Sequence, residues 1–435
     1  MDGRGGTRGQ LRNAGLAIVA AALIGCCLPA APAVATPPRG ACSNPEPGRS
    51  VVRPLPWAQD LLGAERAWPH STGAGVTVAV VDSGVDADHP QLHRPGKVLP
   101  GRDFFLVGKL PGNYDCISHG TAVASIIAAD PAAGIGFHGI APGARILPVR
   151  VTDRETGDSG QGRVIDQAIL ARGIIYAVDQ GARVINLSMS GGEDQKQVRQ
   201  AIAYAVRKDV VVVAAAGNRQ ADDAGPLPSY PAAYPGVLGV GAIDISGARA
   251  SNSQTGPYVD LVAPGEGVLA ATRRTGHQYV SGTSFATPFV SATAALVRAA
   301  WPKLTAAQVI QRLRATATPA RGGSGSPEYG AGIVDPYRAV TEGLAGSART
   351  LPRATMPPPD QQLLATRAWW RDAAAEARGV TSMAVGAALI VTVTGGLLAA
   401  GRRRRWRAGR TSIVRRPAPH DPADPLPEHL FSQRS

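Results

Sequence analysis

The stretch "VTVAVVD", residues 76–82, is an almost uninterrupted apolar run that ends in a carboxylate. A strand whose successive side chains are all apolar is buried on both faces, which is typical of a parallel sheet covered by helices on both sides. Similar runs recur along the chain, and stretches with apolar residues at helical spacing separate them. The sequence therefore predicts an α/β fold built on a parallel sheet.

The predicted elements fill residues 66–342, which we expect to form one domain. The predicted strands are residues 76–82, 144–151, 182–190, 210–218 and 236–243. The predicted helices are residues 119–129, 162–181, 195–209 and a buried, Ala-rich run that starts at Phe285. Before the domain, residues 36–65 are a Pro-rich N-terminal extension. After it, residues 343–378 are a Pro-rich linker and juxtamembrane segment.

Four polar residues stand at the ends of these elements. Asp82 ends the first strand, His119 opens the next helix, Asn218 ends the run 210–218, and Ser284 precedes the last helix. Each residue alone is typical of a helix cap or a turn, and Ser is a common N-cap. In open parallel sheets, however, functional residues collect at the carboxyl ends of the strands, so we expect these four side chains to lie close together.

Together the four residues supply the groups of a serine hydrolase. His119 can take the proton of the Ser284 hydroxyl, and Asp82 can fix the tautomer of His119 and stabilise its charged form. The amide of Asn218 and the backbone N–H of Ser284, at a helix N-terminus, can donate to an oxyanion. The order Asp, His, Ser is that of the subtilisin type. An esterase is a weaker interpretation, because the serine stands in "GTSFA" and not in Gly-x-Ser-x-Gly.

Five stretches resemble, in order, the signature blocks of subtilisin-like serine proteases. They are "VAVVDSGVDADHPQL", "HGTAVASIIA", "INLSMSGG", "VVVVAAAGN" and "SGTSFATPFVSATAALV". The resemblance covers roughly residues 66–342, and it implies a central parallel sheet of about seven strands between helices. Ser83 stands where Thr is common in the family, which keeps a hydroxyl there.

The resemblance narrows to the mycosins, the membrane-anchored subtilases of type VII secretion systems. The shared features are a signal peptide, a Pro-rich extension with Pro56-Trp57, a Cys shortly before the catalytic His, and "GTSFATPFVSA". A Pro-rich linker, a single transmembrane helix and a short basic tail follow. By the same resemblance, the extension wraps the catalytic domain.

The resemblance also implies where a substrate binds. Residues Ser188, Met189, Ser190 and Gly191 would pair with an extended substrate backbone. Residues Ala215, Ala216 and Gly217 would form the other wall of the first specificity pocket. Many subtilases bind calcium, but the available acids lack an ordered ligand spacing, and we expect them to be solvated loop residues. These acids are Asp86, Asp88, Asp153, Asp158, Asp222 and Asp223. The sequence predicts no metal and no other cofactor.

The N-terminus reads as an export signal. Arg8 and Arg12 precede an apolar run, and "AVA" at 33–35 predicts cleavage after Ala35, which makes residues 1–35 a signal peptide. The alternative is a lipoprotein site, because "LIGC" places Cys26 in a lipidation box. Cleavage after Ala35 leaves Cys42 and Cys116, which an exported protein is expected to pair, with two free thiols as the alternative.

A second apolar segment, residues 379–400, carries no charge and is long enough to span a bilayer. "GRRRRWR" follows at once, which predicts a cytoplasmic tail at 401–435 and an external catalytic domain. This tail holds nine arginines against three acidic residues, so it carries much of the net charge of +13. Because no basic stripe with interleaved aromatic residues remains elsewhere, nucleic-acid binding is excluded.

The sequence therefore predicts a single-pass cell-membrane serine endopeptidase that acts on a protein substrate. By resemblance, its partners are components of a type VII secretion membrane complex. The alternative function is that of a structural subunit that stabilises this complex.

Overall fold

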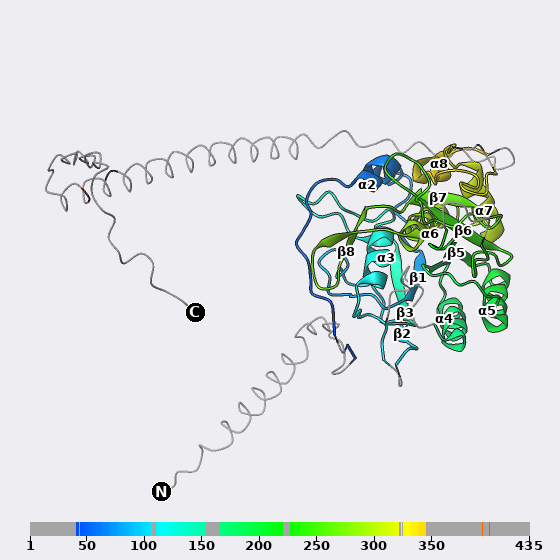
Figure 1. Ribbon diagram of the computed structural model, residues 1–435, viewed down its shortest axis with the longest axis horizontal. Coiled ribbons are helices and arrows are strands. Elements are labelled where there is room, and N and C mark those ends of the chain that lie inside the picture. Colours follow the sequence, from blue (N-terminus) through cyan, green and yellow to red (C-terminus); the bar gives the residue numbers. More distant parts are fainter. Residues whose placement is uncertain are drawn as a thin grey trace, which may run out of the picture. The chain divides into compact units, whose positions relative to one another are not determined.

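The computed structural model describes residues 41–42, 44–106, 110–153, 165–220, 227–321, 323, 325–344, 394 and 400 (Figure 1). A seven-stranded sheet lies at its centre, with every neighbouring pair of strands parallel, in the order β2-β3-β1-β4-β5-β6-β7. The strands are β1 (Thr77–Asp82), β2 (Arg102–Asp103), β3 (Arg145–Arg150), β4 (Val184–Leu187), β5 (Val211–Ala215), β6 (Val237–Ile243) and β7 (Leu261–Pro264). The predicted seven-stranded parallel sheet is confirmed.

Both faces of the sheet are buried, which explains the continuous apolar strands. In β1, Val78 and Val80 belong to one hydrophobic cluster, and Ala79 and Val81 belong to the other. This alternation follows from the two-residue period of a strand. Helices lie over each face, so both sets of side chains are buried away from water.

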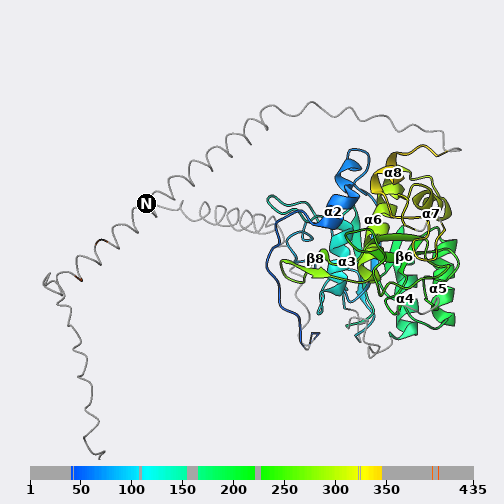
Figure 2. The ribbon, with the colours of Figure 1, turned by 45° about the horizontal axis from the view of Figure 1, so that its top comes forward.

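Figures 1 and 2 show the helices in two layers. The helices α4 (Gln167–Asp179) and α5 (Lys196–Arg207) lie side by side and supply one cluster. The other cluster takes side chains from α2 (Trp57–Leu62), α3 (His119–Ala128), α6 (Thr283–Ala300), α7 (Ala306–Ala315) and α8 (Pro336–Thr341). The helix α6 is almost wholly buried, as its Ala-rich sequence predicts.

The predicted strands correspond to β1, β3, β4, β5 and β6, with bounds shifted by a few residues. The short edge strands β2 and β7, the helices α7 and α8, and an antiparallel pair were not predicted. That pair is formed by β8 (Val268–Ala271) and β9 (His277–Val280).

The N-terminal extension lies along the α/β domain and forms backbone hydrogen bonds with it. Glu46 N–H donates to Cys116 O at 2.9 Å, Arg49 N–H donates to Thr275 O at 2.9 Å, and Gly136 N–H donates to Arg53 O at 2.7 Å. After these contacts the extension forms α2, where the Trp57 indole N–H donates to Gly267 O at 3.0 Å. The extension is therefore part of the folded domain over its described length.

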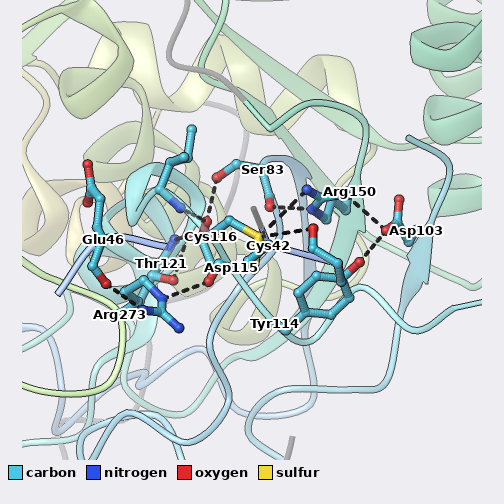
Figure 3. Close-up of a disulfide and its surroundings, with 12 residues drawn as sticks. Cys42, Glu46, Ser83, Asp103, Tyr114, Asp115, Cys116, Thr121, Arg150 and Arg273 are labelled. Carbon is cyan, nitrogen blue, oxygen red and sulfur yellow. Dashed lines mark hydrogen bonds and ion pairs between the residues drawn. A yellow bond between two sulfur atoms is a disulfide. The ribbon is translucent and has the colours of Figure 1, made fainter. Parts of the chain in front are cut away.

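A disulfide between Cys42 and Cys116 joins the extension to the segment that precedes His119 (Figure 3). The pairing expected from the sequence is thus present. The buried Arg150 lies beside the disulfide, and it donates to Ser83 O at 3.1 Å and forms an ion pair with Asp103 at 3.0 Å. The disulfide and these polar contacts hold the backbone shortly after Asp82 and shortly before His119.

The buried His277 also holds the extension. Its Nδ1 accepts from the backbone N–H of Val52 at 3.1 Å, so its proton is on Nε2, which lies 2.7 Å from the Oε1 of Gln91. The neighbouring His89 is equally buried, and its Nδ1 accepts from the backbone N–H of Gln91 at 3.2 Å. Both contacts require neutral imidazoles.

Two predicted segments lie outside the described residues, namely the signal peptide at 1–35 and nearly all of the membrane span at 379–400. Among the residues that the structure describes, no helix is both long enough and apolar enough to cross a bilayer.

Acidification should destabilise the domain through these two histidines. Burial lowers the pKa of His89 and of His277 from 6.5 to about 4. Between those values the unfolded chain binds protons that the folded chain does not, so stability present above pH 6.5 is lost as the pH falls towards 4. Each histidine contributes up to about 1.4 kcal/mol per pH unit in this window.

The test compares the pH dependence of the free energy of unfolding between variants. The His277→Asn variant keeps an acceptor but does not titrate, so its stability should fall less steeply below pH 6.5 than that of wild type. The exposed His93 provides the control, and His93→Asn should keep the wild-type slope. An unchanged slope in His277→Asn would contradict the assignment.

Candidate active site

Asp82 and His119 meet at the carboxyl end of β1. Asp82 is the last residue of β1 and His119 is the first of α3. The His119 Nδ1 lies 2.7 Å from the Asp82 Oδ1, and both side chains are at least nine-tenths buried. Because a carboxylate accepts, Nδ1 carries the proton and Nε2 does not. The predicted pair is therefore in place.

The second oxygen of Asp82 is buried and has no hydrogen-bond partner among the described residues. The backbone N–H of Ser83 donates to Oδ1 at 2.7 Å, beside the imidazole. A buried carboxylate that accepts few hydrogen bonds favours a positive charge on the neighbouring imidazole. This environment suits a histidine that becomes protonated during a reaction.

Ser284 is the second residue of α6, and the N-cap is Gly282. Ser284 is therefore not the N-cap of this helix, so that alternative for its role is wrong. Of the first N–H groups of the helix, that of Thr283 donates to Asn218 Oδ1 at 2.8 Å and that of Phe285 donates to Gly282 O at 3.0 Å. Within the described part of the chain, no hydrogen bond uses the N–H of Ser284. The Phe285 ring lies 5.1 Å from the His119 ring, so the N-terminus of α6 is beside the imidazole.

Asn218 is held with its amide nitrogen towards the serine. Its Oδ1 accepts from both the N–H and the hydroxyl of Thr283, each at 2.8 Å. A Cβ added to Gly282 would lie 3.1 Å from the Asn218 Nδ2 and 3.3 Å from the Ser284 Oγ. Both groups therefore face the space above Gly282, which has a φ of 139°. A hydrogen-bond acceptor placed there would be within reach of the Asn218 amide, as the predicted oxyanion role requires.

A proline shapes the first turn of α6. Pro288 has no N–H, so the carbonyl of Ser284 lacks its ordinary helical partner four residues on. The hydroxyl of the buried Ser188 donates to this carbonyl at 2.6 Å. Asn186, on β4, in turn donates to Ser188 Oγ at 2.9 Å and accepts from Ser291 at 2.8 Å. This network ties the serine-bearing turn to the sheet.

A second polar network surrounds Asp115, close to His119 in the chain, and the sequence did not indicate it. The fully buried Asp115 accepts from Ser83 Oγ at 3.0 Å and from the hydroxyl of Thr121 at 2.7 Å. Ser83 Oγ accepts in turn from the N–H of Gly120 at 2.9 Å. Burial raises the pKa of Asp115 to about 6, and the negative charge of Asp82 adds to the rise. The hydroxyl at Ser83 was noted from the sequence, but no spacing signal pointed to Asp115.

The two predicted substrate walls lie beside this centre. In the segment 188–191, Ser188 and Met189 are buried, and Gly191 exchanges two backbone hydrogen bonds with Tyr230, at 2.7 and 2.8 Å. In the segment 215–217, the N–H of Gly217 donates to the hydroxyl of Thr283 at 3.1 Å. Pairing of the segment 188–191 with a substrate stays a prediction. In the structure the backbone of Gly191 is already hydrogen-bonded to Tyr230.

One predicted loop acid differs from expectation. Asp86 is buried rather than solvated, and its Oδ2 accepts from the backbone N–H of Arg274 at 2.7 Å. The reason is that the loop after β1 packs against the turn between β8 and β9. Asp158, Asp222 and Asp223 lie outside the described residues. Among the described residues no cluster of three or more His, Cys, Asp or Glu side chains could hold a metal ion.

Known proteins resemble this chain in sequence and in fold. The model of the subtilase family matches residues 73–332. Mycosin-1 of Mycobacterium tuberculosis is 38% identical over 375 residues, which cover 74% of this chain and 82% of the relative. Thermitase of Thermoactinomyces vulgaris is 40% identical over 236 residues, covering 54% and 79% respectively. The crystal structure of MycP1 from the ESX-1 type VII secretion system is similar with a TM-score of 0.61 and 33% identity, covering 74% of this chain and 98% of that one.

A methyl group at Gly282 should block the oxyanion position. We expect Gly282→Ala to lower kcat about 10²–10³-fold with little change in KM, because the methyl group displaces the oxygen and not the substrate chain. The positive φ adds backbone strain, so the control is Gly267→Ala, which has a φ of 61° and no atom within 4 Å of the added Cβ. That variant should lose stability without a comparable loss of kcat. Equal kcat in both variants would contradict the placement.

Proposed function

Because this chain belongs to the subtilases and, among them, to the mycosins, we propose that Asp82, His119 and Ser284 form its catalytic triad and cleave a protein substrate through an acyl-enzyme. The chain is a serine endopeptidase by its family. The observation that carries the assignment of roles is the 2.7 Å hydrogen bond between His119 Nδ1 and Asp82 Oδ1.

The proposed reaction begins with proton transfer from Ser284 Oγ to His119 Nε2 as the oxygen attacks the substrate carbonyl. Asp82 stabilises the imidazolium, and the Asn218 amide and the Ser284 N–H donate to the oxyanion. His119 then gives its proton to the leaving amine, and the carbonyl re-forms as an ester of Ser284. A water molecule then attacks this ester and gives its proton to His119. His119 returns the proton to Ser284 Oγ as the carboxylic acid product leaves.

The proposed location is the cell membrane, with the catalytic domain outside and the C-terminus in the cytoplasm. The sequence supports it through the export signal at 1–35, the apolar segment at 379–400 and the arginines that follow. The similar MycP1 and MycP3 structures come from the ESX-1 and ESX-3 type VII secretion systems. We therefore propose that this chain also works with a type VII secretion membrane complex.

Replacing the nucleophile should abolish activity and leave the fold intact. In Ser284→Ala, peptide cleavage should fall at least about 10⁴-fold, and a fluorophosphonate probe should no longer label the full-length protein. The matched control is Ser281→Ala, because Ser281 is an exposed serine three residues earlier that contacts Glu266 at 3.0 Å. It should be labelled like wild type. Turnover that persists in a folded Ser284→Ala protein would contradict the triad.

Removing residues 379–435 tests the anchor. We expect the truncated protein to leave the membrane fraction, because the remaining described helices include none able to span a bilayer. The measurement is fractionation of cells that express either form, with probe labelling in each fraction. If the truncated protein stays with the membrane, the segment 379–400 is not its anchor.

A further inference from the structure

We propose that Asp115 is a positioning residue of the proposed triad, and that only its ionised form holds Asp82 and His119 in the arrangement that proton transfer needs. The inference rests on the proposed function, because it assigns a pH-dependent control to the same active site. Activity would then require a second carboxylate in addition to Asp82. Figure 3 shows Asp115 with its partners Ser83 and Thr121.

The carboxylate of Asp115 accepts four hydrogen bonds from described residues. Its Oδ1 accepts from the hydroxyl of Ser83 at 3.0 Å and from the backbone N–H of Ile117 at 3.1 Å. Its Oδ2 accepts from the N–H and the hydroxyl of Thr121, at 2.9 and 2.7 Å. A protonated carboxyl group would need an acceptor, so one of the two hydroxyls would have to give up its donation. The surroundings therefore fit the ionised form.

On one side, Asp115 holds the residue that follows Asp82. The hydroxyl of Ser83 donates to Asp115, and the backbone N–H of Ser83 donates to Asp82 Oδ1 at 2.7 Å. The same oxygen lies 2.7 Å from His119 Nδ1. A displaced Ser83 would take away the second donor of the oxygen that orients the imidazole. Asp115 is thus one residue removed from the hydrogen bond between Asp82 and His119.

On the other side, Asp115 caps the helix that begins with His119. The N-cap residue of α3 is Ser118, which has a φ of 67° and makes no side-chain cap. A left-handed conformation is unfavourable for a residue other than glycine, so surrounding contacts must hold it. The N–H of Thr121 donates to Asp115 instead, and the helix dipole also favours an anion at this end.

The two sides meet at Gly120. Its N–H donates to Ser83 Oγ at 2.9 Å, and a Cβ at this position would lie 2.0 Å from Gly84 O. The start of α3 therefore lies directly against the loop after β1, with no room for a side chain between them. Because Asp115 binds both parts, the loss of its charge loosens the contact that sets the distance from Asp82 to His119.

The acid that titrates here is Asp115 itself. Burial raises its pKa to about 6, and the negative charge of Asp82 adds to the rise. All four described donors to the carboxylate are uncharged, and Arg273 donates to the backbone O of Asp115 at 2.9 Å. As the pH falls through about 6, Asp115 takes up a proton and the ionised form is lost. The charged or titratable residues around Asp115 and its partners are Glu46, Asp82, Asp86, His119, Arg150 and Arg273.

The test follows the rate at which a fluorophosphonate labels the full-length protein as the pH is lowered, corrected at each pH for the folded fraction. This probe requires the nucleophile and its base but no particular substrate side chain. If His119 alone had to lose a proton, the rate would fall about tenfold per pH unit on the acid side. Because Asp115 must lose one as well, we expect the fall below about pH 6 to approach a hundredfold per unit.

The Asp115→Asn variant keeps the size of the side chain and removes the charge. Its labelling rate at neutral pH should be about 10²-fold lower, because its amide N–H₂ would face two donors. The fall on its acid side should be only about tenfold per unit. A pair of variants at Ser83 gives a milder test. We expect Ser83→Ala to lower the rate about tenfold, and Ser83→Thr, which keeps the hydroxyl, to recover most of that loss.

The control for lost stability is Asp209→Asn. Asp209 accepts from the Arg298 side chain at 3.1 Å, and Arg298 follows Ser284 on α6 at a distance of about 21 Å along the helix. This variant should keep both the wild-type rate per folded molecule and the steep acid fall. A fall of only tenfold per unit in wild type would overturn the inference. So would an Asp115→Asn protein whose rate per folded molecule equals that of wild type, since Asp115 would then be structural only. If Asp115→Asn does not fold, the wild-type slope and the two Ser83 variants decide.

The same probe separates this inference from the proposed function. If wild type is labelled at neutral pH and Ser284→Ala is not, the triad stands whatever the acid slope, and a shallow slope defeats only the role of Asp115. If folded wild type is not labelled at any pH, the proposed function fails and the inference fails with it.

Discussion

The hydrogen bond between His119 and Asp82 depends on the register of the whole sheet. Asp82 reaches the edge of the sheet because β1 runs parallel to β3 and β4, with all three ending on the same side. His119 reaches it because α3 begins there. The Asp115 network and the disulfide at Cys116 hold the segment between the two elements. A shift of one residue in β1 would turn Asp82 to the other face of the sheet and remove the contact.

The serine is positioned by a different set of constraints. The N–H of Ser284 makes no hydrogen bond among the described residues, and the missing side chain of Gly282 leaves the space beside Ser284 Oγ and Asn218 Nδ2 open. Pro288 removes one helical hydrogen bond from the same turn, and Ser188 replaces it from the end of β4. The turn that carries Ser284 is thus bound to the sheet by side chains as well as by packing. Such binding would fix the proposed nucleophile relative to Asn218 without occupying the groups that the proposed reaction needs.

The sequence predicted the site residues that stand at the ends of strands and helices. It did not predict a residue whose role depends on partners far away in the chain. Asp82, His119, Asn218 and Ser284 were predicted because the carboxyl ends of parallel strands share one edge. Asp115 could not be predicted, because it lies in an irregular segment without periodicity. Its side-chain donors are Ser83, which follows β1, and Thr121 on α3. The strands β2 and β7 were too short or too irregular in sequence to stand out.

The central claim is that Asp82, His119 and Ser284 act as one catalytic unit. The most direct measurement is kcat for the three single alanine variants and the triple variant on one peptide substrate. If the three residues act together, the triple variant should be about as slow as Ser284→Ala alone, because the remaining groups have no nucleophile to serve. If the effects multiplied, so that the triple variant were slower by the product of the single losses, the residues would act independently and the account would be wrong.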